Sequence, residues 1–154
     1  MVESKIQIFR PFGPSIAKIK LPEKILNELN NYVDKIIDDE NKSKELNAGE
    51  NLVGDVTQEF MLEPEIMKKS GWGQFLASCV TRWVEWELKK KISKFKIMTS
   101  WVVRQFENEY NPTHWHNGHI SGAGFLKVPK ILGDNVQKKK QKQYRGGNLQ
   151  LIHG

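Results

Sequence analysis

The chain has 154 residues, of which 38% are hydrophobic and 10% aromatic, a composition that fits one folded domain with a single core and excludes a disordered chain. It contains no run of 18 apolar residues and no charged and then apolar N-terminus, so we expect neither a membrane span nor a secretory signal, and a cytoplasmic location. The net charge of +6 is concentrated in a run formed by Lys138, Lys139, Lys140, Lys142 and Arg145. We interpret this run as a solvated loop; the alternative is a nucleic-acid contact, because clustered lysines neutralise phosphates.

The first half of the chain combines short strands with amphipathic segments. Alternating apolar residues predict strands over residues 6–9 and 16–19. Apolar residues at helical spacing then predict a helix that ends at Ile37, with Pro22 in its first turn, where a missing N–H costs nothing. The polar residues 38–51 are expected to form an exposed connection.

A second long helix is predicted over residues 72 to about 91. Its apolar stripe includes Cys79, the single cysteine, which we interpret as a buried structural thiol. Lys89, Lys90 and Lys91 would lie in the last turn and oppose the negative end of the helix dipole. Before this helix, residues 53–62 fit no single pattern, and residues 64–67 are expected to begin a short helical turn that ends near Gly71.

The second half of the chain is rich in strand patterns. We predict strands over residues 97–106, over the histidine segment that follows, over residues 121–129 and from Gly146 to the last residue. In the first of these, Trp101, Val103 and Gln105 would share one face. Helices followed by several strands indicate the α+β class. A sheet that stops on a strand leaves an open edge, which suggests missing sequence or pairing in a homodimer.

Three of the four histidines lie within the segment YNPTHWHNGH, residues 110–119. In an extended strand His114 and His116 would share one face, about 7 Å apart along the backbone. Their imidazoles could then converge on one divalent transition metal ion. The alternative is a polar strand face beside Trp115, because H-x-H is a short motif that also occurs by chance.

These residues carry a resemblance to a known family. The run SWVVRQFENEYNPTHWHNGHISGAGFLKVP, followed by GGNLQLIHG, resembles the front half of a 2-oxoglutarate and Fe(II)-dependent oxygenase, in particular its phage-associated branch. The opening FRPFGPSIAKIKLPEKI is similar to the N-terminal part of that branch. The resemblance implies one domain of α+β class, in which residues 1–95 form N-terminal strands and helices. Residues 96–154 would form the front half of a double-stranded β-helix, a jelly-roll or cupin-like core that is incomplete at its C-terminus.

The resemblance also implies a set of site residues. His114 matches the first iron ligand, and His116 occupies the place of the usual carboxylate, which should favour zinc or copper over Fe(II). His119 is a candidate third ligand or hydrogen-bond donor to the site, and His153 a substitute for the distal histidine. Trp101 and Gln105 are expected to line the cofactor pocket, with core packing as their alternative role.

The activity implied by the resemblance is hydroxylation of a C–H bond with Fe(II), 2-oxoglutarate and O2, in a primary substrate that the residues do not identify. The distal histidine and the basic residue that holds 2-oxoglutarate would lie beyond Gly154, so we expect the 154-residue chain to be inactive. Two alternatives remain. One is a cupin-like protein that binds a metal or small ligand without catalysis, and the other is a structural protein that binds nucleic acid or protein through residues 138–145.

Overall fold

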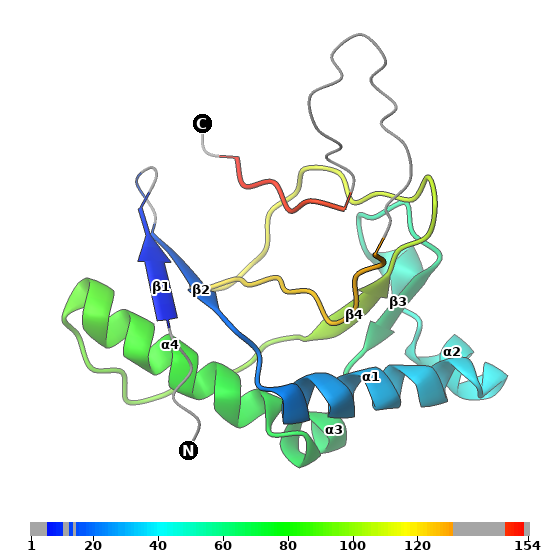
Figure 1. Ribbon diagram of the computed structural model, residues 1–154, viewed down its shortest axis with the longest axis horizontal. Coiled ribbons are helices and arrows are strands. Elements are labelled where there is room, and N and C mark those ends of the chain that lie inside the picture. The colour runs from blue at the N-terminus through cyan, green and yellow to red at the C-terminus, as the bar shows by residue number, and fades with distance from the viewer. Residues whose placement is uncertain (1–5, 11–12, 14, 131–146, 153–154) are drawn as a thin grey trace, which may run out of the picture.

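The computed structural model describes residues 6–10, 13, 15–130 and 147–152. In chain order these residues form β1 (Ile6–Phe9), β2 (Ile16–Ile19), α1 (Glu23–Ile37), α2 (Glu40–Leu46), the 3-10 helix η1 (Gly49–Asn51), β3 (Gln58–Met61), α3 (Pro64–Lys69), α4 (Trp72–Leu88) and β4 (Trp101–Arg104) (Figure 1). The α+β class and the two N-terminal strands are confirmed. The helical turn that was predicted from residue 64 is also confirmed as α3.

The strands form two separate antiparallel pairs. β1 pairs with β2, and β3 pairs with β4 in a register that places Gln58 opposite Arg104 and Met61 opposite Trp101. The two pairs lie apart, at the left and right of Figure 1. Neither pair closes into a barrel within the described residues. The double-stranded β-helix therefore stays a prediction.

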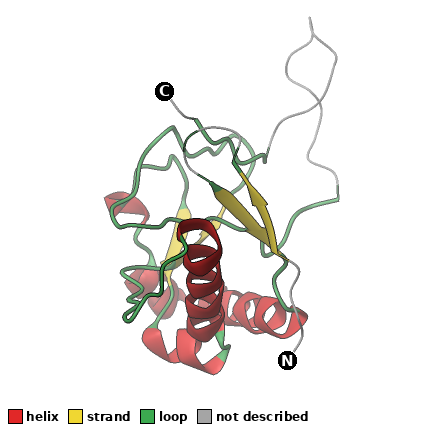
Figure 2. Cartoon of the chain, turned by 90° about the vertical axis from the view of Figure 1, so that its left-hand side faces the viewer, coloured by secondary structure: helices red, strands yellow, loops and turns green. Residues whose placement is uncertain are grey.

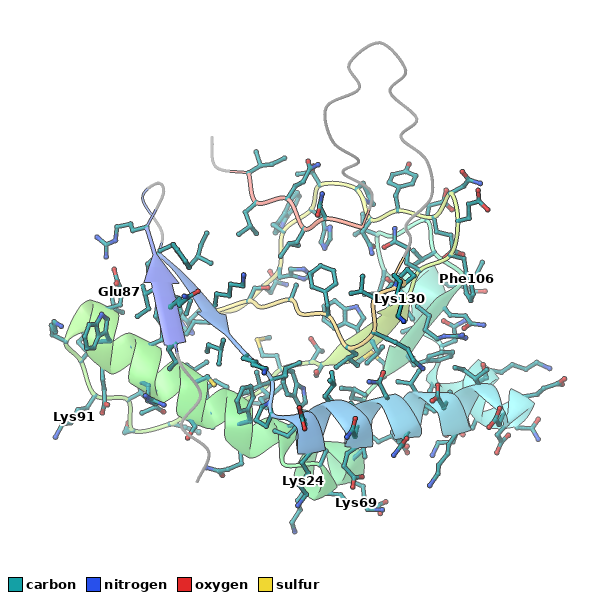
Figure 3. All side chains as sticks on the ribbon, viewed as in Figure 1. Lys24, Lys69, Glu87, Lys91, Phe106 and Lys130 are labelled. Atoms are coloured by element: carbon teal, nitrogen blue, oxygen red, sulfur yellow. The ribbon has the colours of Figure 1, made fainter. Side chains whose placement is uncertain are left out.

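Helix α1 supplies half of the buried hydrophobic residues among those that the structure describes. Its buried residues recur every three or four positions, as the helical pattern predicted, and its polar residues, such as Lys24, point away from the core (Figure 3). The core forms two adjoining clusters between α1, β3 and α3, made by Ile25, Leu29, Leu62 and Ile66 and by Val33, Ile36 and Phe60. Pro22 is the N-cap of α1 and not part of its first turn, which corrects the predicted start by one residue.

Residues 38–50 contain no buried residue, in line with the predicted exposed connection, but the segment forms α2 and η1 where no helix was predicted. Asp39 begins α2: its carboxylate accepts hydrogen bonds from the backbone N–H groups of Asn41, at 3.0 Å, and Lys42, at 3.1 Å. Such N-caps stabilise a helix by about 1 kcal/mol. A short helix with no buried residue can therefore form here without the apolar stripe that identifies the longer helices.

Helix α4 is confirmed, but it ends at Leu88 and not near residue 91. Lys89 takes a left-handed conformation with φ of 54°, which ends the helix, so the three lysines follow α4 and do not lie in its last turn as predicted. Cys79 is half-buried in α4, and burial raises the pKa of its thiol. None of the helices in the described ranges has the length and apolarity that crossing a membrane requires.

The second half of the chain contains less strand than predicted. The strand expected over residues 97–106 is limited to the four residues of β4, since β3 offers only four partners. Within the described residues, the histidine segment, residues 121–129 and residues 147–152 are loops, so those three strand predictions are wrong there (Figures 1 and 2). A strand requires a neighbour for its backbone groups, and among the described residues these segments have one only at the single bridge between Tyr110 and Asp55. Residues 146, 153 and 154 lie outside the described residues.

Candidate metal site

The β3–β4 pair has two chemically different faces. Phe60 and Val102 face α1 and belong to the core. Because side chains alternate along a strand, Glu59, Trp101 and Val103 lie on the opposite face, which we call the outer face. The prediction that Trp101 and Val103 share a face is thereby confirmed. The histidine segment approaches this face, since the His116 ring lies 5.5 Å from the Trp101 ring, centroid to centroid.

Two sets of contacts anchor the chain before the histidines. Tyr110 and Asp55 form an isolated antiparallel bridge, with N–H to carbonyl distances of 2.9 and 3.3 Å. The Glu109 carboxylate accepts hydrogen bonds from the backbone N–H of Phe106, at 2.8 Å, and from both the N–H and the hydroxyl of Thr57, at 3.0 and 2.7 Å. These hydrogen bonds lower the pKa of the Glu109 carboxyl, and the bond from the Phe106 N–H has the largest effect. These contacts therefore fix the turn formed by residues 106–110 on the segment that leads into β3.

His114 and His116 meet through their ring nitrogens. Their Nε2 atoms are 3.0 Å apart, and the rings are nearly perpendicular, at 82°. The Nδ1 atom of His114 lies 2.7 Å from the Pro112 carbonyl, which can only accept, so Nδ1 carries the proton. The neutral ring then has its lone pair on Nε2, directed at His116. Metal-binding histidines usually have this arrangement, in which the remote N–H donates to a carbonyl or carboxylate.

The separation of the two Nε2 atoms fits a shared ion. Metal to imidazole bonds of roughly 2.1 Å that meet at about a right angle place the two nitrogens about 3.0 Å apart. Without an ion, the same contact is a hydrogen bond in which His116 Nε2–H donates to His114. No three His, Cys, Asp or Glu side chains among the described residues are close enough to hold an ion together. The histidines could thus supply two ligands, and no third lies close to them among the described residues.

The other predicted site residues have different surroundings. Trp101 is half-buried and its ring lies 5.5 Å from that of His116, so its role in lining a cofactor pocket stays a prediction. The Gln105 amide donates to the Glu109 carbonyl, so that donor is used within the turn. His119 is exposed, and His153 lies outside the described residues. The roles of Gln105, His119 and His153 stay predictions.

Glu59 is the outer-face residue that the sequence analysis missed. Its relative exposure is 1%, and its Oε2 atom has no hydrogen-bond partner among the described residues. Burial raises the pKa of its carboxyl, and the nearby His114 partly opposes that rise. The available signal was an acidic residue directly before the apolar run of residues 60–62.

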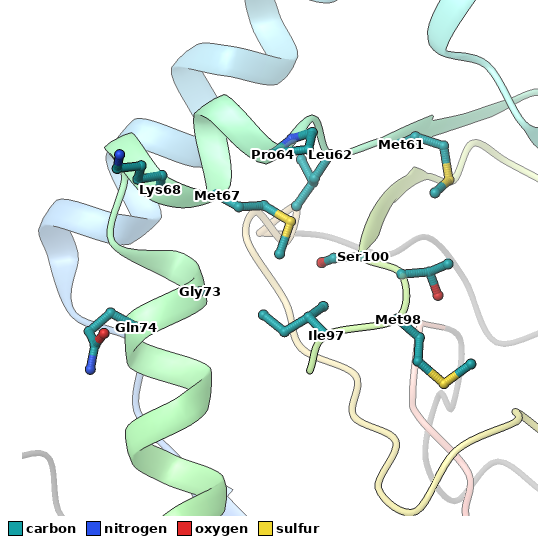
Figure 4. Close-up of a pocket in the computed structure, with 11 residues that line it drawn as sticks. Met61, Leu62, Pro64, Met67, Lys68, Gly73, Gln74, Ile97, Met98 and Ser100 are labelled. Atoms are coloured by element: carbon teal, nitrogen blue, oxygen red, sulfur yellow. The ribbon is translucent and has the colours of Figure 1, made fainter. Parts of the chain in front are cut away.

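A separate hollow of about 520 Å³ lies between β3, α3, the start of α4 and residues 97–100 (Figure 4). Met61, Met67 and Met98 line it, and Lys68 contributes the one charged side chain among the described residues that surround it. Because no histidine or carboxylate borders the hollow there, it is not the candidate metal site.

Comparison of the chain with known proteins found no matching family model, no similar curated protein and no similar solved structure. The resemblance to 2-oxoglutarate and Fe(II)-dependent oxygenases therefore rests on the quoted residues alone.

Proposed function

We propose that His114 and His116 bind one divalent transition metal ion, and that this ion is Fe(II) used with 2-oxoglutarate and O2 to hydroxylate a substrate. The observation that carries the metal proposal is the 3.0 Å separation of two Nε2 atoms, one of which has its lone pair oriented by the Pro112 carbonyl. The oxygenase part, with the double-stranded β-helix that it implies, rests on the sequence resemblance. Bound Fe(II) would supply the redox chemistry that couples 2-oxoglutarate decarboxylation to C–H oxidation.

The surrounding residues support the metal proposal by holding the two rings in place. The Pro112 carbonyl accepts a hydrogen bond from the Nδ1–H of His114, which keeps that ring from turning away. Trp101 packs against the ring of His116. Glu109 ties the preceding turn to Thr57 through two hydrogen bonds. Fixing the ligands before the ion arrives lowers the entropy lost on binding.

A second candidate function, metal binding without catalysis, is favoured by the exposure of the site. His114 and His116 are both exposed, and Trp115 between them is 88% exposed. Oxygenase chemistry benefits from a site that excludes water, because water gives access to side reactions. A solvent-exposed pair of imidazoles is therefore better suited to binding a metal ion than to oxidising a substrate.

Calorimetric titration of the metal-free chain with Co(II) tests the metal proposal, and succinate release from 2-oxoglutarate with added Fe(II) separates the two functions. We expect one Co(II) per chain in the wild type and a loss of affinity of at least tenfold in His114→Ala and in His116→Ala. Asn117→Ala, at an exposed position of the same segment, is the control and should bind like the wild type. Equal binding by all four proteins would refute the metal proposal, and succinate release that depends on His114 and His116 would exclude the second function.

A nucleic-acid or protein partner at residues 138–145 stays a prediction, because those residues lie outside the described ones. The same holds for a homodimer and for the cytoplasmic location.

A further inference from the structure

Glu59 has a fixed backbone and an unsatisfied side chain. Its N–H donates to the Asn47 Oδ1 atom, at 3.2 Å, and its carbonyl accepts from the N–H of Ala48, at 2.8 Å. On the other side it is paired in register with Val103 of β4. The main chain thus holds Glu59 from both sides, and the group left without a partner is its carboxylate oxygen.

A carboxylate in this position is costly unless a cation accompanies it. An ionised group that is removed from water without a partner is destabilised, so buried acidic groups in proteins are paired, bind metal ions or take up a proton. Arg104, the basic residue of β4, does not pair with the Glu59 carboxylate, because it lies on the opposite face and bonds to Gln58. The cationic or metal-binding groups that approach the outer face come from the histidine segment.

The strand register places Glu59 next to that segment. Glu59 lies opposite Val103, so Trp101, two residues away on the same face, is its diagonal neighbour, at a Cα separation of about 7–8 Å. The Trp101 ring in turn contacts the His116 ring, 5.5 Å away. One face of the strand pair therefore brings together a buried carboxylate, an indole and two converging imidazoles.

We propose that Glu59 is the acidic residue of the metal site, whose carboxylate turns toward the ion held by His114 and His116 and balances its charge. This inference rests on the proposed metal function. Because no three candidate ligands among the described residues lie within reach of one ion, the carboxylate must rotate toward the ring nitrogens or act through a bound water. Its contribution is a negative charge and a hard oxygen donor, which the site otherwise lacks because His116 stands where a carboxylate is usual.

The test compares Co(II) affinity and Co(II) absorption in the wild type, Glu59→Gln and Glu107→Gln. Both variants remove one negative charge, but Glu107 is exposed, so it controls for the change in net charge. We expect Glu59→Gln to weaken Co(II) binding by about tenfold or more and to alter the visible absorption bands, and Glu107→Gln to change neither. Unchanged affinity and spectrum in Glu59→Gln would overturn the inference.

A second measurement separates a metal role from a structural one. Glutamine removes the cost of burying a charge, so the metal-free Glu59→Gln chain should unfold at the same temperature as the wild type or higher, while gaining less stability from Co(II). An equal gain in both would refute the inference. If Glu59→Gln does not fold, Glu59→Asp keeps the charge but withdraws it by one methylene. It should bind Co(II) more weakly than the wild type, and equal affinity would refute the inference.

The two proposals fail in different ways. If the wild type binds no Co(II), or binds it equally without His114 and His116, the metal function itself fails and the Glu59 inference with it. If binding depends on both histidines but is indifferent to Glu59, the Glu59 inference alone is wrong.

Discussion

The phenol of Tyr32, in the middle of α1, donates a hydrogen bond of 2.5 Å to the carboxylate of Glu63, the residue directly before α3. Lys42 of α2 lies 3.1 Å from the same carboxylate. A single acidic side chain therefore links three helices around the core. The Tyr32 hydrogen bond and the Lys42 contact both lower the pKa of Glu63.

The lowered pKa of Glu63 predicts acid sensitivity. A carboxyl whose pKa is lower in the folded than in the unfolded chain stabilises the fold above its unfolded pKa, and this stability is lost as the pH falls through the folded pKa. The carboxylate is part-exposed, so we expect a contribution below about 1 kcal/mol. Urea unfolding of the wild type and Glu63→Gln, between about pH 6 and pH 3, measures it. A stability difference that does not shrink on acidification would contradict this prediction.

Removal of the Tyr32 hydroxyl should cost about 1 kcal/mol at neutral pH, the usual net value of one hydrogen bond. Burial, followed by the bond to Glu63 and the nearby charges of Glu63 and Glu65, raises the pKa of Tyr32. The neutral phenol thus stabilises the fold below its unfolded pKa, and this stability is lost as the pH rises through the folded pKa. Denaturant unfolding of Tyr32→Phe at pH 7 tests the magnitude. A variant as stable as the wild type would show that the hydrogen bond contributes nothing.

Replacement of Phe60 by alanine should be the most damaging core substitution among the described residues. Phe60 is fully buried between α1 and β4, so truncation leaves a cavity and should cost about 3–5 kcal/mol. Phe125 is 56% exposed, and Phe125→Ala should cost less than about 1 kcal/mol. Thermal unfolding followed by circular dichroism compares the two variants. Equal losses of stability in the two variants would show that Phe60 is not a core residue.

Two glycines at the start of α4 should respond to alanine in opposite directions. Gly71 has φ of 80°, where a β-carbon is strained although nothing lies within 4 Å, so Gly71→Ala should destabilise by about 1–2 kcal/mol. Gly73 is helical, and a β-carbon there meets Ile97 at an ordinary 3.7 Å. Gly73→Ala should therefore stabilise by up to about 1 kcal/mol. Chemical unfolding measures the stability of both variants. Destabilisation by Gly73→Ala would show that the added methyl group is crowded by its neighbours and would contradict this prediction.

Metal preference tests the composition of the site. Two imidazoles alone should bind copper and zinc more tightly than Fe(II), by the usual order of affinities for nitrogen ligands. Competition titrations against a coloured chelator give the order for the wild type. If Fe(II) bound as tightly as zinc, the site would contain oxygen ligands in addition to the Glu59 carboxylate.

The elements that the sequence predicted well are those whose local pattern and packing agree. The apolar spacing of Leu29, Val33 and Ile36 identifies α1 because all three side chains face β3 or α3. Helix α2 was missed because its stability comes from a cap on Asp39 and not from a buried stripe. Strand patterns in the second half failed for a further reason: alternation describes a segment that could pair, but pairing depends on a partner elsewhere in the chain.

The candidate site was predicted in part. The H-x-H spacing identified His114 and His116, but for a wrong reason, since the rings converge from a loop and not from one face of a strand. The Pro112 carbonyl and Glu59 depend on loop shape and strand register, which residue types alone do not define. Glu59 in particular becomes conspicuous only once its burial is known.

The apolar side chains along the loops of the second half affect how the chain behaves in solution. Phe125, Val128, Leu149, Leu151 and Ile152 are each more than half exposed. The net charge of +6 opposes contact between chains at low ionic strength. Added salt screens this repulsion, with a screening length of about 10 Å at 0.1 M, while the attraction between apolar surfaces persists. Light scattering should accordingly rise with sodium chloride concentration, so storage in dilute buffer would keep the protein dispersed.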